Sequence, residues 1–463
     1  AARHAILILA IAIPAQDYHI TQHKMNDLTP SNRRLVHLAG VLAGSALAAY
    51  GLHQLWNKQN SGGDDTYPVD LGTYSLKHQT TSKTCQRWCD RAWAWVAGFH
   101  RQEASDCFLE AIRADPQCAM AHYGLALVNG PDYNFTAEGG FYTLASQPSN
   151  WPSLNVAVNA LKRAEEITRE PSWSGPPQHR ALIKAMFSTR YEWPVTPTTA
   201  DKQVAYRDAM RTVAVTYPND PEVQAIYAES VMCLSAWDLY DNQTTNPTPN
   251  EYGRECAIAL DRGLMVAPSH LWLCHLKVHY NEMGPVDQFD WSAAEALRSP
   301  GHRHEIGHLL HMPTHLDIQA GEYEKAMRWN KLAYQADLKV IRAFPDKNLV
   351  IYTGYLVHNM EFAAWAAMYG GSYENAMEAA NEIDQIVTEK LLMKSERTAQ
   401  RMVRQTAPFV LLLIKFCNVC GVVVLMLTIS CFLFVFFFPF VLPLSLLVSS
   451  CLPLSPPGVI SCY

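Results

Sequence analysis

The sequence lacks the polar–apolar alternation that is typical of half-buried β-strands. Between about residues 82 and 416, apolar side chains recur three and four positions apart, which is the spacing of one face of an α-helix. Glycine and proline interrupt this pattern at intervals that suit pairs of helices. The lack of strand signal argues against a fold built on a large sheet and predicts an all-α body.

The chain also has no excess of positive charge. It contains 37 Lys and Arg residues against 43 Asp and Glu residues, which is a formal net charge of -6. Because binding to a nucleic acid needs clustered basic residues, we expect no nucleic-acid partner. The 12 cysteines are scattered and lack the spacing of a disulfide or zinc framework. Cys417 and Cys420 form a lone CxxC pair in an apolar segment, which is weak evidence for a metal or redox site.

The N-terminal part of the chain differs from the body. Residues 1–24 precede a plausible initiator, Met25, and are interpreted as a non-native leader. Two arginines at positions 33 and 34 then precede an uncharged run over residues 35–56, which is the order found in a signal-anchor or an uncleaved signal sequence. Residues 25–81 are therefore predicted to hold one transmembrane segment and a polar linker, with the body on the non-cytoplasmic side of the membrane. The alternative is an ordinary alanine-rich helix in a cytoplasmic protein.

The C-terminal residues 417–463 have a different composition again. No charged residue follows Lys415, and residues 422–438 are apolar and long enough to span a bilayer. Several prolines follow closely, and no basic residue flanks the far side. Two origins remain for this segment. It is either a tail anchor or translated non-coding sequence from a faulty gene prediction.

Three segments of the body have the residue pattern of tetratricopeptide repeats, which are 34-residue helix-turn-helix units. In QEASDCFLEAIRADP, GEYEKAMRWNKLAYQAD and GSYENAMEAA, aromatic and small residues recur at helical spacing. The glycine that opens the last two would end a helix, because it tolerates a left-handed backbone, and alanine lets two helices approach closely. We therefore predict a tetratricopeptide-like α-solenoid of antiparallel helix pairs over residues 82–416. The residues that carry the pattern are Ala104, Phe108, Ala111, Pro116, Gly321, Tyr323, Ala326, Ala333, Gly371, Tyr373 and Ala376.

The same region resembles a family of tetratricopeptide-like proteins whose members mostly have no known reaction. The resemblance is clearest at GHLLHMPTHLDIQAGEYEKAMRWNKLAYQAD, and it includes HLKVHYNEM and YLVHNMEFAAWAA. It implies an α-solenoid fold but no particular activity. Family members continue past PFVLLLIKF with further helical repeats, whereas this chain departs from the pattern at Cys417. For that reason we favour mistranslated sequence over a tail anchor after that point.

Histidine is concentrated in one part of the body. Eight of the 18 histidines fall between His270 and His315. On a helix, residues three, four and seven positions apart lie on one stripe. Two such stripes occur, in HLKVHYNEM and in GHLLHMPTH, and we expect them to face each other on neighbouring helices. Their members are His275, His279 and Glu282 in the first stripe, and His308, His311 and His315 in the second.

These side chains form a ligand set for a divalent transition metal. Imidazole nitrogen suits zinc, copper and iron, and a mixed His and Glu set argues against calcium or magnesium. His358 belongs to another motif and is a candidate ligand, or a partner of a ligand, from a third helix. Pro313 cannot donate to the Leu309 carbonyl, so a kink is expected inside the second stripe. The His and Glu ligand set is compatible with zinc, copper and iron, so the identity of the metal is left open among these three.

Two functions of different kinds follow. In the first, the body is a metal-binding protein or a metal-dependent enzyme, in which Glu282 is a ligand or a general base. The sequence has no His-Glu-x-x-His motif, so the zinc metalloprotease mechanism is not supported. In the second, the solenoid is an adaptor that binds a protein or peptide on its concave face, and the histidines form a buried hydrogen-bond network. The concentration of His, Trp and Tyr in the body favours the first.

Overall fold

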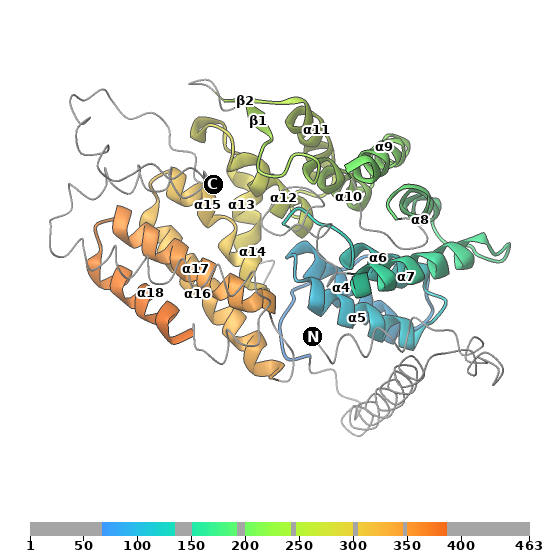
Figure 1. The fold of residues 1–463 in the computed structure, drawn as a ribbon, viewed down its shortest axis with the longest axis horizontal. Coiled ribbons are helices and arrows are strands. Elements are labelled where there is room, and N and C mark those ends of the chain that lie inside the picture. The colour runs from blue at the N-terminus through green and yellow to red at the C-terminus, as the bar shows by residue number, and fades with distance from the viewer. Residues whose placement is uncertain are drawn as a thin grey trace, which may run out of the picture. The chain divides into compact units, whose positions relative to one another are not determined.

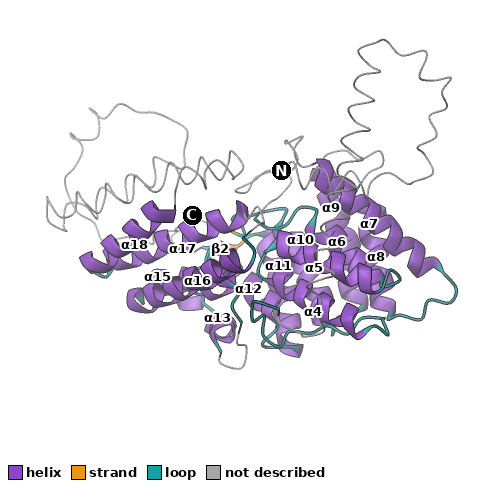
Figure 2. Ribbon diagram, turned by 90° about the horizontal axis from the view of Figure 1, so that it is seen from below, coloured by secondary structure: helices purple, strands orange, loops and turns teal. Residues whose placement is uncertain are grey.

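The computed structural model describes residues 67–134, 151–191, 200–241, 247–299, 304–345 and 350–386. Helix predominates in these residues, and the strands are two short segments (Figure 2). The predicted all-α class is therefore confirmed. The predicted leader, transmembrane segment and apolar tail lie outside the described residues.

The chain divides into two compact units, and each is described by itself. The first unit includes α4 to α11, most of α12, and α13 (Figure 1). Several consecutive helices pack against each other, among them α4 with α5, α6 with α7 and α10 with α11. The helices are α4 (Lys83–Ala97), α5 (Arg101–Ala114), α6 (Ala119–Val128), α7 (Trp151–Arg169), α8 (Pro177–Thr189), α9 (Ala200–Thr216), α10 (Pro221–Met232), α11 (Glu251–Val266), α12 (Leu271–Asn281) and α13 (Trp291–Arg298).

A glycine sets the distance between α5 and α6. A Cβ atom added at Gly124 would lie 2.1 Å from the ring of Phe108, which is fully buried on α5. The aromatic ring therefore occupies the space that any other residue at position 124 would need. Ala104 and Ala111, which the repeat pattern places on the same face of α5, are also fully buried. The predicted contact face of this helix is thus confirmed.

The second unit contains the short strands and the remaining helices. Strands β1 (Tyr240–Asp241) and β2 (Thr248–Pro249) pair antiparallel, with Tyr240 opposite Pro249. The helices are the 3₁₀ turn η2 (Val286–Gln288), α14 (Gly307–His311), α15 (Thr314–Gln319), α16 (Tyr323–Ala343), α17 (Val350–Tyr369) and α18 (Tyr373–Ile386). Helix α16 packs against α14, α15 and α17, and α17 packs against α18.

Two turns of the second unit have the same geometry. Gly321 follows α15 with φ +81°, and Gly371 follows α17 with φ +70°. In each turn the glycine N–H donates to the carbonyl three residues back, and the next N–H donates to the carbonyl five residues back. This is the Schellman motif, which satisfies the last carbonyls of a helix and needs a left-handed residue at the glycine position. The predicted helix ends at both Gly-x-Tyr sequences are therefore confirmed.

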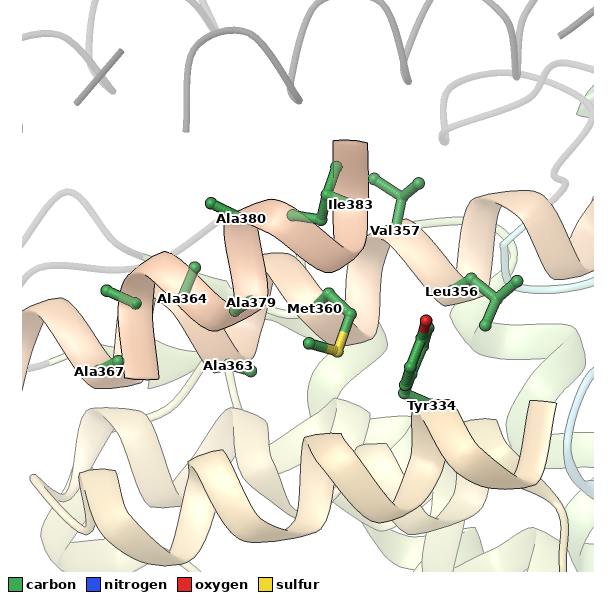
Figure 3. Close-up of a cluster of buried hydrophobic side chains, with 11 residues drawn as sticks. Tyr334, Leu356, Val357, Met360, Ala363, Ala364, Ala367, Ala379, Ala380 and Ile383 are labelled. Atoms are coloured by element: carbon green, nitrogen blue, oxygen red, sulfur yellow. The ribbon is translucent and has the colours of Figure 1, made fainter. Parts of the chain in front are cut away.

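Small residues line the contact between α16, α17 and α18. Figure 3 shows the buried cluster, in which alanines of α17 and α18 lie beside larger side chains such as Met360 and Tyr334. Ala326, Ala333 and Ala376, which the repeat pattern selects, are all buried. Alanine at such positions lets helix axes approach, because it has no side chain beyond Cβ. Across the described part of the chain, no helix is both long and apolar enough to cross a membrane.

Candidate metal centre

The second histidine motif forms two short helices. Helix α14 ends at His311, and α15 begins at Thr314 after Pro313. Proline has no N–H for the hydrogen-bond ladder and clashes with the preceding turn, so the chain bends there as predicted. The second stripe is therefore divided between two helices, with His308 and His311 on α14 and His315 on α15, and does not lie on the single kinked helix that was predicted.

A glycine holds α14 close to α16. A Cβ atom added at Gly307 would lie 2.1 Å from Oδ1 of Asp337 and 2.7 Å from the carbonyl oxygen of Ala333. Both neighbours belong to α16, and Asp337 is itself fixed by a 2.8 Å hydrogen bond from the Asn359 amide of α17. The backbone of α14 therefore rests directly on α16, which brings His311 within reach of side chains from that helix.

Three histidines from three helices come together in the second unit. His311 of α14, His315 of α15 and His358 of α17 each offer a ring nitrogen, and these nitrogens lie within 4.8 Å of one another. His311 is fully buried, whereas His315 and His358 are partly exposed. Small shifts of the side chains would bring nitrogens at this separation to the 2.0–2.1 Å metal–nitrogen distance of zinc sites.

Asn330 of α16 determines which nitrogen of His311 is available. The Asn330 amide nitrogen donates to the Ala326 carbonyl at 2.9 Å, so its oxygen is the atom that faces His311. That oxygen lies 2.6 Å from Nδ1 of His311 and can only accept a hydrogen bond. Nδ1 therefore carries the proton, and Nε2 of the neutral ring carries a lone pair that points toward His315.

Glu282 orients the second histidine. Its carboxylate oxygen lies 2.5 Å from Nδ1 of His315, and the Gln319 amide donates to the Glu282 backbone carbonyl at 2.8 Å. A carboxylate that accepts from the rear nitrogen of an imidazole fixes the tautomer and the orientation of the ring, which is common behind metal-binding histidines. Glu282 lies in the turn after α12, which ends at Asn281, so its predicted place on the helical stripe is wrong.

The front nitrogens of these two histidines face each other. Nε2 of His311 lies 2.9 Å from Nε2 of His315. Two imidazole lone pairs at this distance repel each other unless a proton or a metal ion lies between them. The pair is therefore a site that attracts a cation, and a proton competes with a metal for it.

Phe362 forms one wall of the centre. It lies one turn after His358 on α17, and its ring centroid lies 4.9, 4.5 and 4.7 Å from those of His311, His315 and His358. An apolar wall lowers the local dielectric and restricts how the three rings can turn. His315 and His358 are partly exposed, whereas His311 is fully buried.

The remaining predicted residues have other surroundings. His308 stacks on Tyr355 with ring centroids 4.4 Å apart. His275 and His279 lie on α12 as predicted, in the first unit. That the two histidine motifs face each other stays a prediction. In the first unit, Nδ1 of His275 lies 2.5 Å from the Ala97 carbonyl oxygen, and the His279 ring lies 4.7 Å from that of Tyr133.

No model of a known protein family matches the chain, and no curated protein is significantly similar to it.

Proposed function

We propose that His311, His315 and His358 hold a divalent transition-metal ion and that the protein is a metal-dependent enzyme. The 2.9 Å approach of the His311 and His315 Nε2 atoms carries this proposal. Asn330 and Glu282 occupy the rear nitrogens of the same two rings, at 2.6 and 2.5 Å, so both lone pairs converge on the space that the ion would take. Such support from behind the ligands is a feature of metal sites.

The number of ligands favours catalysis over a purely structural ion. Structural zinc sites are closed by four protein ligands, whereas catalytic sites use three and keep one position for water or substrate. This centre offers three histidines, and two of them are partly exposed. A bound ion would supply Lewis-acid polarisation of a substrate oxygen or a more acidic bound water. In this proposal Glu282 orients His315 and is not itself a ligand.

The matching turns support the finer description of the fold. Gly321 and Gly371 end helices with the same Schellman motif, and each precedes a helix that starts at the tyrosine two residues later. We propose that α15 with α16, and α17 with α18, are tetratricopeptide-like antiparallel pairs of an α-solenoid. This agrees with the family resemblance of GHLLHMPTH and its surroundings.

Metal analysis of the purified full-length chain tests the centre. The protein is dialysed against zinc ions, washed, and its zinc content is compared with that of His311→Ala and of His304→Ala. His304 is a matched control, because it is also a buried histidine but contacts the Leu297 carbonyl instead. We expect His311→Ala to hold one equivalent less than the wild type and His304→Ala to hold the same amount.

A second measurement separates the enzyme from the adaptor. Cobalt ions substituted for zinc report the coordination number through their visible spectrum, and an open site gives a spectrum that changes when a small anion is added.

The zinc comparison itself can contradict the proposal. Equal zinc content in wild type and His311→Ala, with a lower melting temperature for the variant, would show a structural hydrogen-bond network instead of a metal centre. The adaptor would then be the better description.

A further inference from the structure

A second group of metal-ligating side chains lies in the first unit. Cys85 and Cys89 are one turn apart on α4, and Cys118 is the residue that precedes α6. The three sulfur atoms lie within 4.8 Å of one another, and all three side chains are fully buried. Cys256 and Cys274, in contrast, are buried cysteines of the same unit that belong to no such group among the described residues.

The local structure brings these segments together. Helix α4 begins after Ser82, whose side chain accepts a 3.2 Å hydrogen bond from the Cys85 N–H. The Thr80 hydroxyl donates to the Asp115 carboxylate at 2.5 Å, which ties the residues before α4 to the loop that leads into Cys118. The positions of the sulfur atoms are therefore set by a capped helix and by a loop that is tied to the residues before that helix.

The sulfur atoms contact one another inside the first unit. The Cys85 thiol is hydrogen-bonded to those of Cys118 and Cys89, and the Asp115 carboxylate interacts electrostatically with it. Three fully buried sulfur donors close to a carboxylate form surroundings that suit a cation.

We propose that Cys85, Cys89 and Cys118 form a thiolate site for a soft, thiophilic metal ion, Cu(I) in preference to Zn(II). Thiolate ligands select Cu(I), Zn(II) and iron–sulfur clusters, and a cluster of the last kind is held by four cysteines. Three sulfur donors within one buried space suit trigonal Cu(I), whereas Zn(II) in a closed protein site takes four protein ligands. Each metal–sulfur bond replaces a sulfur–hydrogen bond where the thiol is protonated, and the proton leaves to solvent. No change in oxidation state is involved.

Copper loading of the full-length chain under anaerobic, reducing conditions tests the site. The probe is Cu(I) itself, supplied with a chelator that competes for it, and the readouts are copper content and the X-ray absorption of the bound ion. We expect one equivalent of Cu(I) that the chelator does not remove and a first shell made of sulfur. Cys85→Ala and Cys118→Ala should each lose this copper at least tenfold more readily.

Two controls keep the site separate from folding and from the histidine centre. Cys256→Ala removes a buried thiol of the same unit outside the cluster and should retain the copper, and helical circular dichroism reports whether each variant folds. His311→Ala should also retain it, so failure of the histidine centre leaves this result unaffected. Copper that is held by nitrogen alone, copper that Cys85→Ala retains in full, or stronger binding of Zn(II) than of Cu(I) would each overturn the proposal.

Discussion

Nδ1 of His311 lies 2.6 Å from the side-chain oxygen of Asn330, and this one contact decides the tautomer of the histidine. The asparagine is itself held by the Ala326 carbonyl, one turn back on α16. A polar residue on a packing helix thus determines the chemistry available on the neighbouring helix, because it leaves Nε2 as the unprotonated atom.

Replacing Asn330 tests that relationship. Asn330→Leu removes the acceptor and should weaken metal binding at the centre by about 10- to 100-fold, which is the usual effect of losing a partner behind a ligand. Asn330→Asp keeps an oxygen acceptor at the same place and should retain most of the affinity. Competition with a metal chelator measures both. Equal losses in the two variants would mean that packing, and not the hydrogen bond, is responsible.

Replacing Glu282 tests the second orienting contact. Glu282→Gln keeps the size of the side chain but removes the charge that faces Nδ1 of His315 at 2.5 Å. We expect metal affinity to fall by about 10- to 100-fold while the helical content stays the same. Glu322→Gln is the matched control, because Glu322 is an exposed carboxylate of the same unit. A complete loss of metal from Glu282→Gln would instead show that Glu282 is itself a ligand.

The helical class and the contact faces could be predicted because they depend on local spacing. Ala104, Ala326 and Ala376 repeat at positions that a regular helix turns toward its neighbour, and all are buried. The glycine turns could also be predicted, because a left-handed residue leaves a direct signal in the sequence.

The metal centre could be predicted only in part, because its geometry depends on where helices end. Regular 3.6-residue periodicity placed Glu282 on α12, but the helix stops one residue earlier and the side chain approaches from a turn. The sequence did not indicate that Asn330 contacts the metal centre, since a single asparagine within a helical pattern is usually exposed. Cys118 was missed for a similar reason: its contact with α4 depends on tertiary packing and not on spacing along the chain.

The close contact of α5 and α6 predicts a stability effect. Gly124→Ala adds a methyl group that would lie 2.1 Å from the Phe108 ring, so either the ring or the helix must move. Overpacking of this kind costs about 1–3 kcal/mol of unfolding free energy. Adding Phe108→Leu to Gly124→Ala should recover part of the loss, and chemical denaturation of the four proteins in this cycle measures the coupling. If the stability losses of the two single variants simply add in the double variant, the strain does not lie between residue 124 and the Phe108 ring.

Glu229, a buried carboxyl group of α10, predicts that the unfolding free energy depends on pH around neutrality. Burial raises the pKa of Glu229 from 4.5 to about 8, the Asp132 carboxylate adds to the shift, and Arg190 opposes it. Because the folded state holds the proton more tightly, this contribution to stability is full below about pH 4.5 and is lost as pH rises through about 8.

The Glu229→Gln variant measures the size of this contribution. Glutamine stays neutral, so the variant should gain stability relative to the wild type as pH rises, by on the order of a few kcal/mol. Denaturation of both proteins at several pH values between about 5 and 9 provides the comparison. A constant difference over that range would show that Glu229 titrates normally.

Buried histidines of the first unit predict that the protein loses stability as the pH falls into the acid range. Burial lowers the pKa of His78 from 6.5 to about 3, with a smaller contribution from His179, whose ring lies 6.2 Å away. Since the folded state disfavours the proton, the stability that the neutral ring provides is full above about pH 6.5 and is lost as pH falls toward about 3.

His78→Phe cannot be protonated but can keep the stacking on Trp93, whose ring lies 6.4 Å away at 22°. We therefore expect the variant to unfold at a lower pH than the wild type in an acid titration followed by circular dichroism. The two proteins should have similar stability at about pH 8, where His78 is neutral in the folded and unfolded states alike. Identical acid midpoints would mean that protonation of His78 does not limit acid stability.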